Sequence, residues 1–229
     1  MALSVSQTKA LAGVIKPGMK IASMGYPDII AKIEMEGLEY REDSEAICRR
    51  HGLQPRQIPD AHSYFNIQGC GLDVYDIVKE RGCEILCDLN EPLETGLSYD
   101  IVLDVGTVEH CFNISQAIKN MAGLVKEGGY IIHENPFNWA NHGFYNLNPT
   151  FFWDFYRENG FDVMECCLTT KAGQKADVPL IQRFKFTEME VNIFTMARRT
   201  KVQDFVFPMQ SKYKPAAGVR AEVKETVNG

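Results

Sequence analysis

Side chains able to exchange protons near neutral pH gather in two stretches of the chain. The segment "VEH" contains Glu109 and His110, and "NPFNWANHGFYNLNP" (135–149) contains His142 and Tyr145. Histidine can accept a proton near neutral pH, and a phenol can orient the group that loses it. These residue types suit general acid–base chemistry, so His142, His110 and Tyr145 are the candidate catalytic side chains.

The second stretch is also rich in amides. It places Asn135, Asn138 and Asn141 beside aromatic residues. Amides both donate and accept hydrogen bonds, which suits a hydroxylated acceptor such as a sugar, so these three are candidate substrate ligands. The alternative is structural, because asparagines also stabilise turns and His142 would then pack against Phe144.

Structural roles are open to other residues as well. Glu109 could begin the following helix, where a carboxylate is favoured. His133 lies inside an apolar strand, which is typical of a core histidine with both ring nitrogens bonded. His51 and His62 receive no assignment.

The seven cysteines are an odd number at irregular spacing, which indicates reduced thiols in a cytoplasmic protein. None forms the paired CxxC sets of a zinc site, so we expect no metal. The closest combinations are Cys48 with His51, Cys83 with Cys87, and Cys166 with Cys167.

Composition excludes several classes of function. The net charge of −6 and a pI near 5.4 argue against nucleic acid as the partner. No apolar run approaches the ~18 residues of a membrane span, and the start of the chain lacks a signal-peptide core. We expect a small-molecule partner.

Alternating apolar runs and helical patterns must position these residues. We expect helices over 5–16, 28–37, 42–52, 113–129 and 148–160. We expect strands over 19–25, 71–77, 83–90, 99–106, 128–136, 161–170 and 190–200, and a loop over 53–71.

This alternation predicts an α/β fold with a mainly parallel sheet, in which the strand over 99–106 is central. Ligands in such sheets bind at the carboxyl ends of the strands, where Asp76, Asp88, Gly106 and Asn135 fall. We expect one domain over 1–214 with an insert at about 38–70, and a mobile tail over 215–229.

The segment "YDIVLDVGTVEHCFNISQAIKNMAGLVKEGGYIIHENP" (99–136) resembles the second half of a class I S-adenosylmethionine-dependent methyltransferase. In that family a strand ends near "EH", a helix follows, and "vkpGG" leads into the next strand. "FYRENGFDVMECC" and "VNIFTMARR" resemble its closing helix and final antiparallel hairpin. The likeness extends to bacterial members carrying "HDLN", "HGFY" and "PxQxKY", here "CDLN" (87–90), "HGFY" (142–145) and "PMQSKY" (208–213).

The resemblance implies a Rossmann-like, seven-stranded sheet with an antiparallel last strand, helices on both faces, and S-adenosylmethionine as cofactor. Gly25 matches the turn that passes close to the methionine moiety. Asp76 matches the acid that accepts hydrogen bonds from both ribose hydroxyls, and Asp88 the residue near the adenine amino group. Gly106 and Thr107 match positions beside the transferred methyl.

The first turn departs from the family pattern. Where the family reads acid-x-Gly-x-Gly-x-Gly, this chain reads "SMGYPDI", in which Ser23 replaces the acid and Pro27 a glycine. Three functions stay open: a methyltransferase acting on a small hydroxylated acceptor, such as a sugar or nucleotide-sugar of bacterial surface polysaccharide synthesis; a catalytically inactive scaffold; or an enzyme that reuses the fold for another reaction. The intact second half and the polar loop favour the first.

Overall fold

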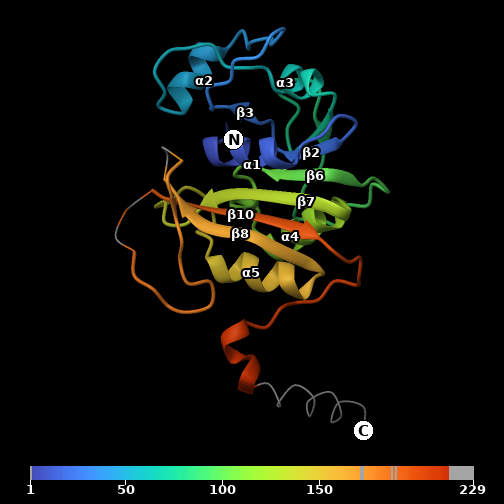
Figure 1. Ribbon diagram of the computed structural model, residues 1–229, viewed down its shortest axis with the longest axis vertical. Helices are drawn as coiled ribbons and strands as arrows, with labels where there is room; N and C mark the ends of the chain where they lie inside the picture. Colours follow the sequence, from blue (N-terminus) through green and yellow to red (C-terminus); the bar gives the residue numbers. More distant parts are fainter. Residues whose placement is uncertain (1, 171–172, 187, 189, 217–229) are drawn as a thin grey trace.

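A twisted β-sheet forms the centre of the molecule (Figure 1). The computed structural model describes residues 2–170, 173–186, 188 and 190–216. Within them the sheet has eight strands in the order β5-β4-β2-β6-β7-β10-β8-β9. Most of the predicted tail, residues 217–229, lies outside the described residues, so its mobility stays a prediction.

Five neighbouring strands pair in parallel, so their carboxyl ends meet at one edge of the sheet. They are β5 (Ile85–Leu86), β4 (Gly71–Asp76), β2 (Lys20–Met24), β6 (Tyr99–Asp104) and β7 (Val125–Pro136).

The far side of the sheet is antiparallel. Strand β10 (Asn192–Arg199) pairs with both β7 and β8 (Phe161–Thr169) in the antiparallel sense, as the resemblance implied. The two-residue strand β9 (Lys175–Ala176) adds an eighth strand to the seven predicted. The Rossmann-like α/β class is confirmed.

Strand β2 lies between β4 and β6, and the chain leaves it in both directions. It runs from β2 to β4 and β5 on one side, then returns to β6 and β7 on the other. This reversal makes the carboxyl ends of β2 and β6 the topological switch point, where open α/β sheets bind their ligands.

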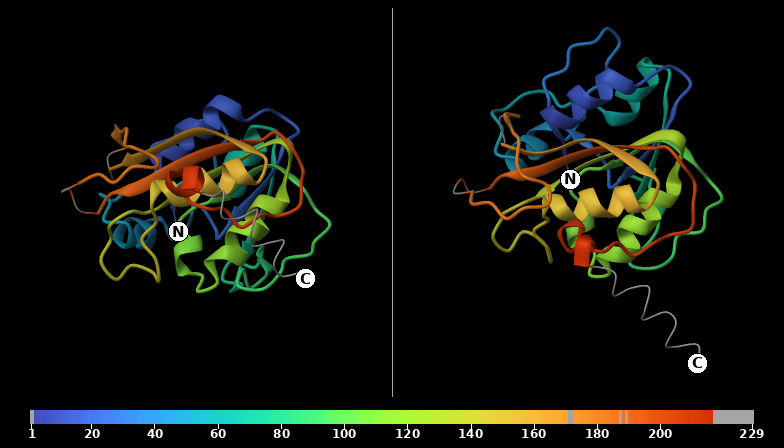
Figure 2. Two further views of the ribbon diagram at one scale, coloured as in Figure 1. Left: turned by 90° about the horizontal axis from the view of Figure 1, so that it is seen from below. Right: turned by 60° about the horizontal axis from the view of Figure 1, so that its bottom comes forward.

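Helices cover both faces of the sheet (Figures 1 and 2). On one side lie α1 (Val5–Val14), α2 (Ser44–Arg50) and α3 (Ala61–Ile67), and on the other α4 (Ile114–Leu124) and α5 (Pro149–Glu158). Apolar residues alternate between the two faces of each strand, which gives two cores. The first buries Ile101 and Leu103 against Leu11 and Phe65. No described helix combines the length and apolar character needed to cross a membrane.

The start of the chain crosses the carboxyl edge of the sheet. The short strand β1 (Ala2–Leu3) pairs in parallel with β3 (Asp28–Ile29), and the Ala2 N–H donates to the Val105 carbonyl at 3.2 Å. Ser4 then caps α1 in a capping box with Gln7.

Two predictions between β2 and β4 were wrong. The segment 28–37, expected as a helix, forms β3 and then irregular chain. Asp28 and Ile29 pair with Ala2 and Leu3 of β1, and the buried Asp28 carboxylate is held by Arg81 and Arg50. The expected loop 53–71 contains α3, whose N-cap Asp60 accepts from the Ser63 N–H. Phe65 of α3 packs in the core, while the boundaries of the domain and insert stay predictions.

Arg199 offers a test of how β10 is tied to α4. Its buried guanidinium donates to the Ala122 carbonyl, in the last turn of α4, at 3.1 Å and to the carbonyl of Val125, the C-cap residue of α4, at 2.7 Å. We expect Arg199→Met to lower the free energy of unfolding by about 2–3 kcal/mol, because two buried carbonyls lose a charged donor. Urea denaturation measures it. The exposed neighbour Arg198→Met is the control, and equal losses in both variants would contradict the assignment.

Candidate active site

The predicted cofactor residues meet at one edge because the strands end in register. The Gly25 N–H donates to the Tyr75 carbonyl at 2.7 Å, which places Gly25 level with Asp76. Asp76 pairs with Leu86 of β5, and Asp88 follows just beyond. The edge therefore brings together three residues that lie far apart in the sequence.

The two acids at this edge differ in their spare hydrogen-bonding capacity. Asp76 is half-buried, and its Oδ1 accepts one N–H, from Val78 at 3.3 Å, among the described residues. Asp88 is exposed, and its Oδ1 accepts from the backbone and side-chain nitrogens of Asn90 at 2.9 and 2.8 Å. Asp76 therefore keeps the acceptor capacity that a pair of hydroxyls needs.

The turn after β2 is buried and held by a hydrogen bond within the turn. Gly25 holds a φ of 81°, in the left-handed region, and Ser23 Oγ donates to its carbonyl at 2.8 Å. Gly25, Tyr26 and Pro27 are all buried. Ser23, which stands where the family has an acid, is thus used within the turn.

Charged and aromatic side chains fill the space after this turn. The Asp28 carboxylate contacts Arg81 at 3.0 Å and His51 at 3.4 Å. The Arg81 guanidinium lies 4.2 Å from the Tyr26 ring centroid, and the Tyr26 hydroxyl donates to Asp60 at 2.7 Å. Burial, helped by this bond to Asp60, raises the pKa of Tyr26 well above its usual value.

Strand β6 ends in the fully buried carboxylate of Asp104. It lies 2.7 Å from His133 Nδ1 and accepts from Asn135 Nδ2 and the Thr107 N–H, both at 2.8 Å. His133 Nε2 lies 2.5 Å from the Tyr156 hydroxyl. Both ring nitrogens of His133 therefore have a hydrogen-bond partner, Asp104 at Nδ1 and Tyr156 at Nε2. The prediction that His133 is a satisfied core histidine is confirmed.

These contacts fix the charge states of Asp104 and Tyr156. Burial alone would raise the pKa of Asp104, but the hydrogen bond and electrostatic attraction from His133, with the hydrogen bonds from Asn135 and Thr107, outweigh it and lower that pKa. Burial, with the nearby Asp104 charge, raises the pKa of Tyr156 well above its usual value. Asp104 is therefore an anion and Tyr156 a neutral phenol.

A second buried carboxylate, Glu109, faces both candidate histidines. Its side chain is 1% exposed, and Oε2 accepts from Asn135 Nδ2 at 3.0 Å. Oε1 has no hydrogen-bond partner among the described residues and lies 3.7 Å from His142 Nε2 and 3.9 Å from His110 Nε2. Glu109 lies within the 3₁₀ turn Val108–His110, before α4 rather than at its start.

The loop that carries His142 is fastened to the backbone of Glu109. The Glu109 carbonyl accepts from the Phe144 N–H at 2.9 Å and the Tyr145 N–H at 3.3 Å. A Cβ at Gly143 would lie 2.9 Å from that carbonyl oxygen, so only glycine allows this approach. The Tyr145 hydroxyl donates to the Phe112 carbonyl at 2.9 Å.

Aromatic rings surround the two histidines. The His142 ring lies 5.2 Å from the His110 ring and 5.4 Å from Trp139. Phe144 packs edge-on against Phe112 instead, with both rings largely exposed. The Glu109 carboxylate raises the pKa of His142 above its ordinary value, against the effect of partial burial.

The three candidate asparagines lie in different environments. Asn135 is buried and bridges Asp104 and Glu109, leaving Oδ1 without a partner among the described residues. Asn138 donates to the Glu188 carbonyl at 2.6 Å and accepts from the Val191 N–H at 3.0 Å, which is a structural role. Asn141 is exposed with a φ of 55°.

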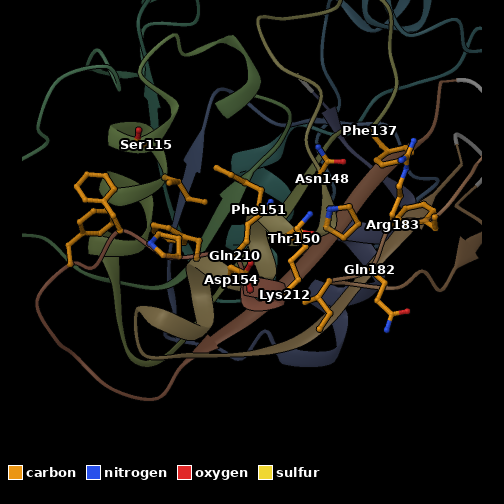
Figure 3. Close-up of a pocket in the computed structure, with 18 residues that line it drawn as sticks. Ser115, Phe137, Asn148, Thr150, Phe151, Asp154, Gln182, Arg183, Gln210 and Lys212 are labelled. Carbon is orange, nitrogen blue, oxygen red and sulfur yellow. The ribbon is translucent and has the colours of Figure 1, made fainter. Parts of the chain in front are cut away.

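A cavity of about 560 Å³ lies beside α5 and is a separate feature (Figure 3). Phenylalanine rings form much of its wall, and Pro208, Gln210 and Lys212 of the "PMQSKY" motif line it. Ser211 of the same motif instead donates to the buried Asp154 carboxylate. None of the predicted site residues lines the cavity.

The seven cysteines are free thiols. Burial, with nearby carboxylates, raises the pKa of Cys87 to about 11 and of Cys111 and Cys167 to about 12. Burial likewise raises the pKa of Cys166 to about 11. These thiols are protonated near neutral pH and are poor nucleophiles.

No known family model matches the sequence, and no curated protein matches it. The chain is similar to several solved structures, three of which follow with their degree of likeness. TehB from Haemophilus influenzae has 12% identity over 83% of this chain, with a TM-score of 0.44. The match covers only 60% of the TehB chain. A TehB-like S-adenosylmethionine-dependent methyltransferase from Corynebacterium glutamicum has 11% identity over 83% of this chain and 85% of that chain, with a TM-score of 0.48.

A third is the 1,6-didemethyltoxoflavin-N1-methyltransferase of Burkholderia thailandensis, solved with bound S-adenosylhomocysteine. It shares 15% identity over 85% of this chain and 76% of that chain, with a TM-score of 0.47. Likeness at this level assigns neither activity nor cofactor. What defines the chain is its own Rossmann-like sheet, with titratable side chains at the carboxyl edge.

Asp104→Asn tests the buried network. The lowered pKa in the folded state means that Asp104 stabilises the fold above its unfolded pKa of about 3.9, and that this contribution disappears as pH falls through the folded value. We expect the variant to lose about 3–5 kcal/mol at pH 7 and to lose part of the parent's acid sensitivity. Urea denaturation from pH 7 to pH 3 measures both.

Asp162→Asn, at an exposed position of β8, is the control and should follow the parent curve. An Asp104→Asn protein with the parent's stability and pH profile would show that the network is not a charged one.

Proposed function

We propose that the chain is an S-adenosylmethionine-dependent methyltransferase acting on a small hydroxylated acceptor, with sugars and nucleotide-sugars the first class to try. One observation carries the proposal. The carboxyl edge of the parallel strands carries both an acid with spare acceptor capacity, Asp76 at the end of β4, and the cluster of Glu109, His110 and His142 after β6 and β7.

The residues at this edge fit the cofactor best at its ribose end. The Asp76 carboxylate would accept both ribose hydroxyls, and Asp88 would lie near the adenine amino group. Gly25 and Gly106 both hold positive φ, and both would lie toward the methionine end. Gly106 would pass closer to it, because Gly25 is buried with its N–H and its carbonyl already bonded. Thr107 is fixed by its Oγ1, which donates to the Met24 carbonyl at 2.6 Å.

The cofactor supplies an electrophilic methyl on a positive sulfur. With the cofactor bound, the acceptor oxygen would take the methyl, the electrons of the S–CH₃ bond would remain on sulfur, and the acceptor's proton would pass to the histidine cluster. His142 and His110 would receive that proton, and Tyr145, beside the loop anchor on Glu109, would orient the acceptor. Exposed Asn141 and the aromatic rings of Phe112 and Phe144 offer contacts to a sugar.

A non-catalytic binding protein of the same fold is the second candidate. It is favoured by the closed first turn, in which Gly25 and Pro27 are buried, and by β1, which crosses the same edge. Binding of S-adenosylhomocysteine in calorimetry separates the two, because a scaffold has no need of it.

Asp76→Ala should weaken S-adenosylhomocysteine binding by about 1.5–3 kcal/mol, because two ribose hydroxyls lose a charged acceptor. Isothermal titration calorimetry measures the change. Asp204→Asn, exposed in the segment that packs on α5, removes one charge elsewhere and should bind like the parent. Unchanged affinity in Asp76→Ala would remove Asp76 from the site.

His142→Ala should reduce turnover of a hydroxyl acceptor by ~10²–10⁴, because the reacting hydroxyl loses the general base that takes its proton. Affinity for S-adenosylhomocysteine should be nearly unchanged. Loss of cofactor binding would place His142 in the cofactor pocket, and no effect on either measurement would leave His110 as the acid–base candidate. Initial-rate kinetics and calorimetry on the same protein separate these outcomes.

A further inference from the structure

We propose that Glu109, His110 and His142 bind one divalent transition-metal ion. Each offers one ligand atom, and the three atoms lie within 4.8 Å of one another. Ligands around a common ion at about 2.0–2.2 Å stand roughly 3–3.5 Å apart in a tetrahedral site, so small rotations of two exposed imidazoles close the site. It is the one such group of potential ligands among the residues that the structure describes.

The orphaned oxygen of Glu109 points to a cation. Glu109 Oε2 is taken by Asn135, but Oε1 is buried, has no hydrogen-bond donor in the described chain, and faces His110 and His142. At 3.7 and 3.9 Å the two imidazoles compensate the charge of this buried oxygen only in part, whereas a cation between them would bond to all three groups.

The backbone already holds the ligands close together. His110 follows Glu109 directly, and His142 is brought back by the bonds from Phe144 and Tyr145 to the Glu109 carbonyl. The absence of a Cβ at Gly143 lets the loop backbone lie directly against the Glu109 carbonyl. Ligands held by backbone contacts before binding lose little freedom on metal binding.

Hydrogen bonds behind the carboxylate complete the arrangement. Asn135 Nδ2 donates to both Glu109 and Asp104, and Asp104 is itself held by His133 and backbone N–H groups. Outer partners of this kind orient a ligating carboxylate and raise the affinity of the site for the ion.

The ligand set selects the class of metal. Two imidazoles and one carboxylate suit Zn²⁺, Fe²⁺ and neighbouring first-row ions, whereas Mg²⁺ and Ca²⁺ prefer oxygen ligands alone. Three protein ligands leave a coordination position open, as in catalytic rather than structural zinc sites. The two histidines are 42–47% exposed, so this open position faces the solvent side.

The ion's use in catalysis rests on the proposed function, whereas its binding does not. Glu109 Oε1 would lie 3.3 Å from a Cβ at Gly106, so the ion would sit beside the predicted methyl position. A hydroxyl of the acceptor in the open position would be held there and made more acidic. His142 and His110 would then hold the ion rather than take the proton themselves.

Titration of the metal-free protein with Co²⁺, followed by visible absorption and calorimetry, tests the binding. We expect one ion per chain and four- or five-coordinate bands from nitrogen and oxygen ligands. Glu109→Gln keeps the shape of the side chain, and His142→Ala removes a half-exposed ring, so both should fold. Each should weaken Co²⁺ binding at least 10–100-fold. Zn²⁺ should displace Co²⁺ from the parent.

His51→Ala and Cys83→Ser are the matched controls, because each removes a potential ligand outside the site, and both should bind Co²⁺ like the parent. A sulfur-to-cobalt charge-transfer band would show cysteine ligation and overturn the assignment. Equal affinity in the parent, Glu109→Gln and His142→Ala, or no saturable binding to the parent, would also overturn it.

Separate binding of S-adenosylhomocysteine keeps this result distinct from the methyltransferase proposal. Cobalt binding without S-adenosylhomocysteine binding would sustain the metal site and remove the proposed function. The reverse result would remove the metal site and leave the histidine cluster as the proton acceptor.

Discussion

The buried carboxylate of Asp104 is the charge on which the carboxyl edge depends. A charge fully removed from water is stable only when donors replace its hydration. Here they come from the turn after β6, from His133 and Asn135 of β7, and, through His133, from Tyr156 of α5. Three elements must therefore take fixed positions around one oxygen pair, and Gly106 is fixed with them.

Strand β7 places buried polar side chains on both faces of the sheet. Its alternation directs His133 and Asn135 to the α5 side, whereas Glu134 lies on the α1 side. There Glu134 accepts from Thr169 at 2.8 Å and from Ser4, at the start of α1. Burial raises the pKa of Glu134, although these hydrogen bonds oppose the shift. One strand thus fastens the histidine cluster and the start of the chain to the same edge.

The regular second half of the chain could be predicted from sequence because local pattern and tertiary packing agree there. Strands β6, β8 and β10 lie where apolar periodicity indicates. Helix α4 was expected to reach Gly129 but ends at Leu124, because β7 begins at Val125, which pairs with Tyr99. The segment 28–37 could not be predicted, since its pairing with β1 and the buried ionic contacts of Asp28 join it to distant residues. The clustering of His110 with His142 was also hidden, because it depends on the close approach of Gly143 to Glu109. Asp104 was missed from the sequence, although it is an acid near the end of an apolar strand, and its partner His133 was assigned only to the core.

The protonated, buried thiols can report local opening of the fold. Cys111 lies directly after His110, and Cys166 and Cys167 lie in β8. The chain therefore has thiols that can report opening both beside the site and in the antiparallel half of the sheet. A thiol kept from ionising by burial becomes reactive when its surroundings open to water. The rate at which a soluble alkylating reagent consumes each cysteine therefore records how often that region opens, with no label added to the chain.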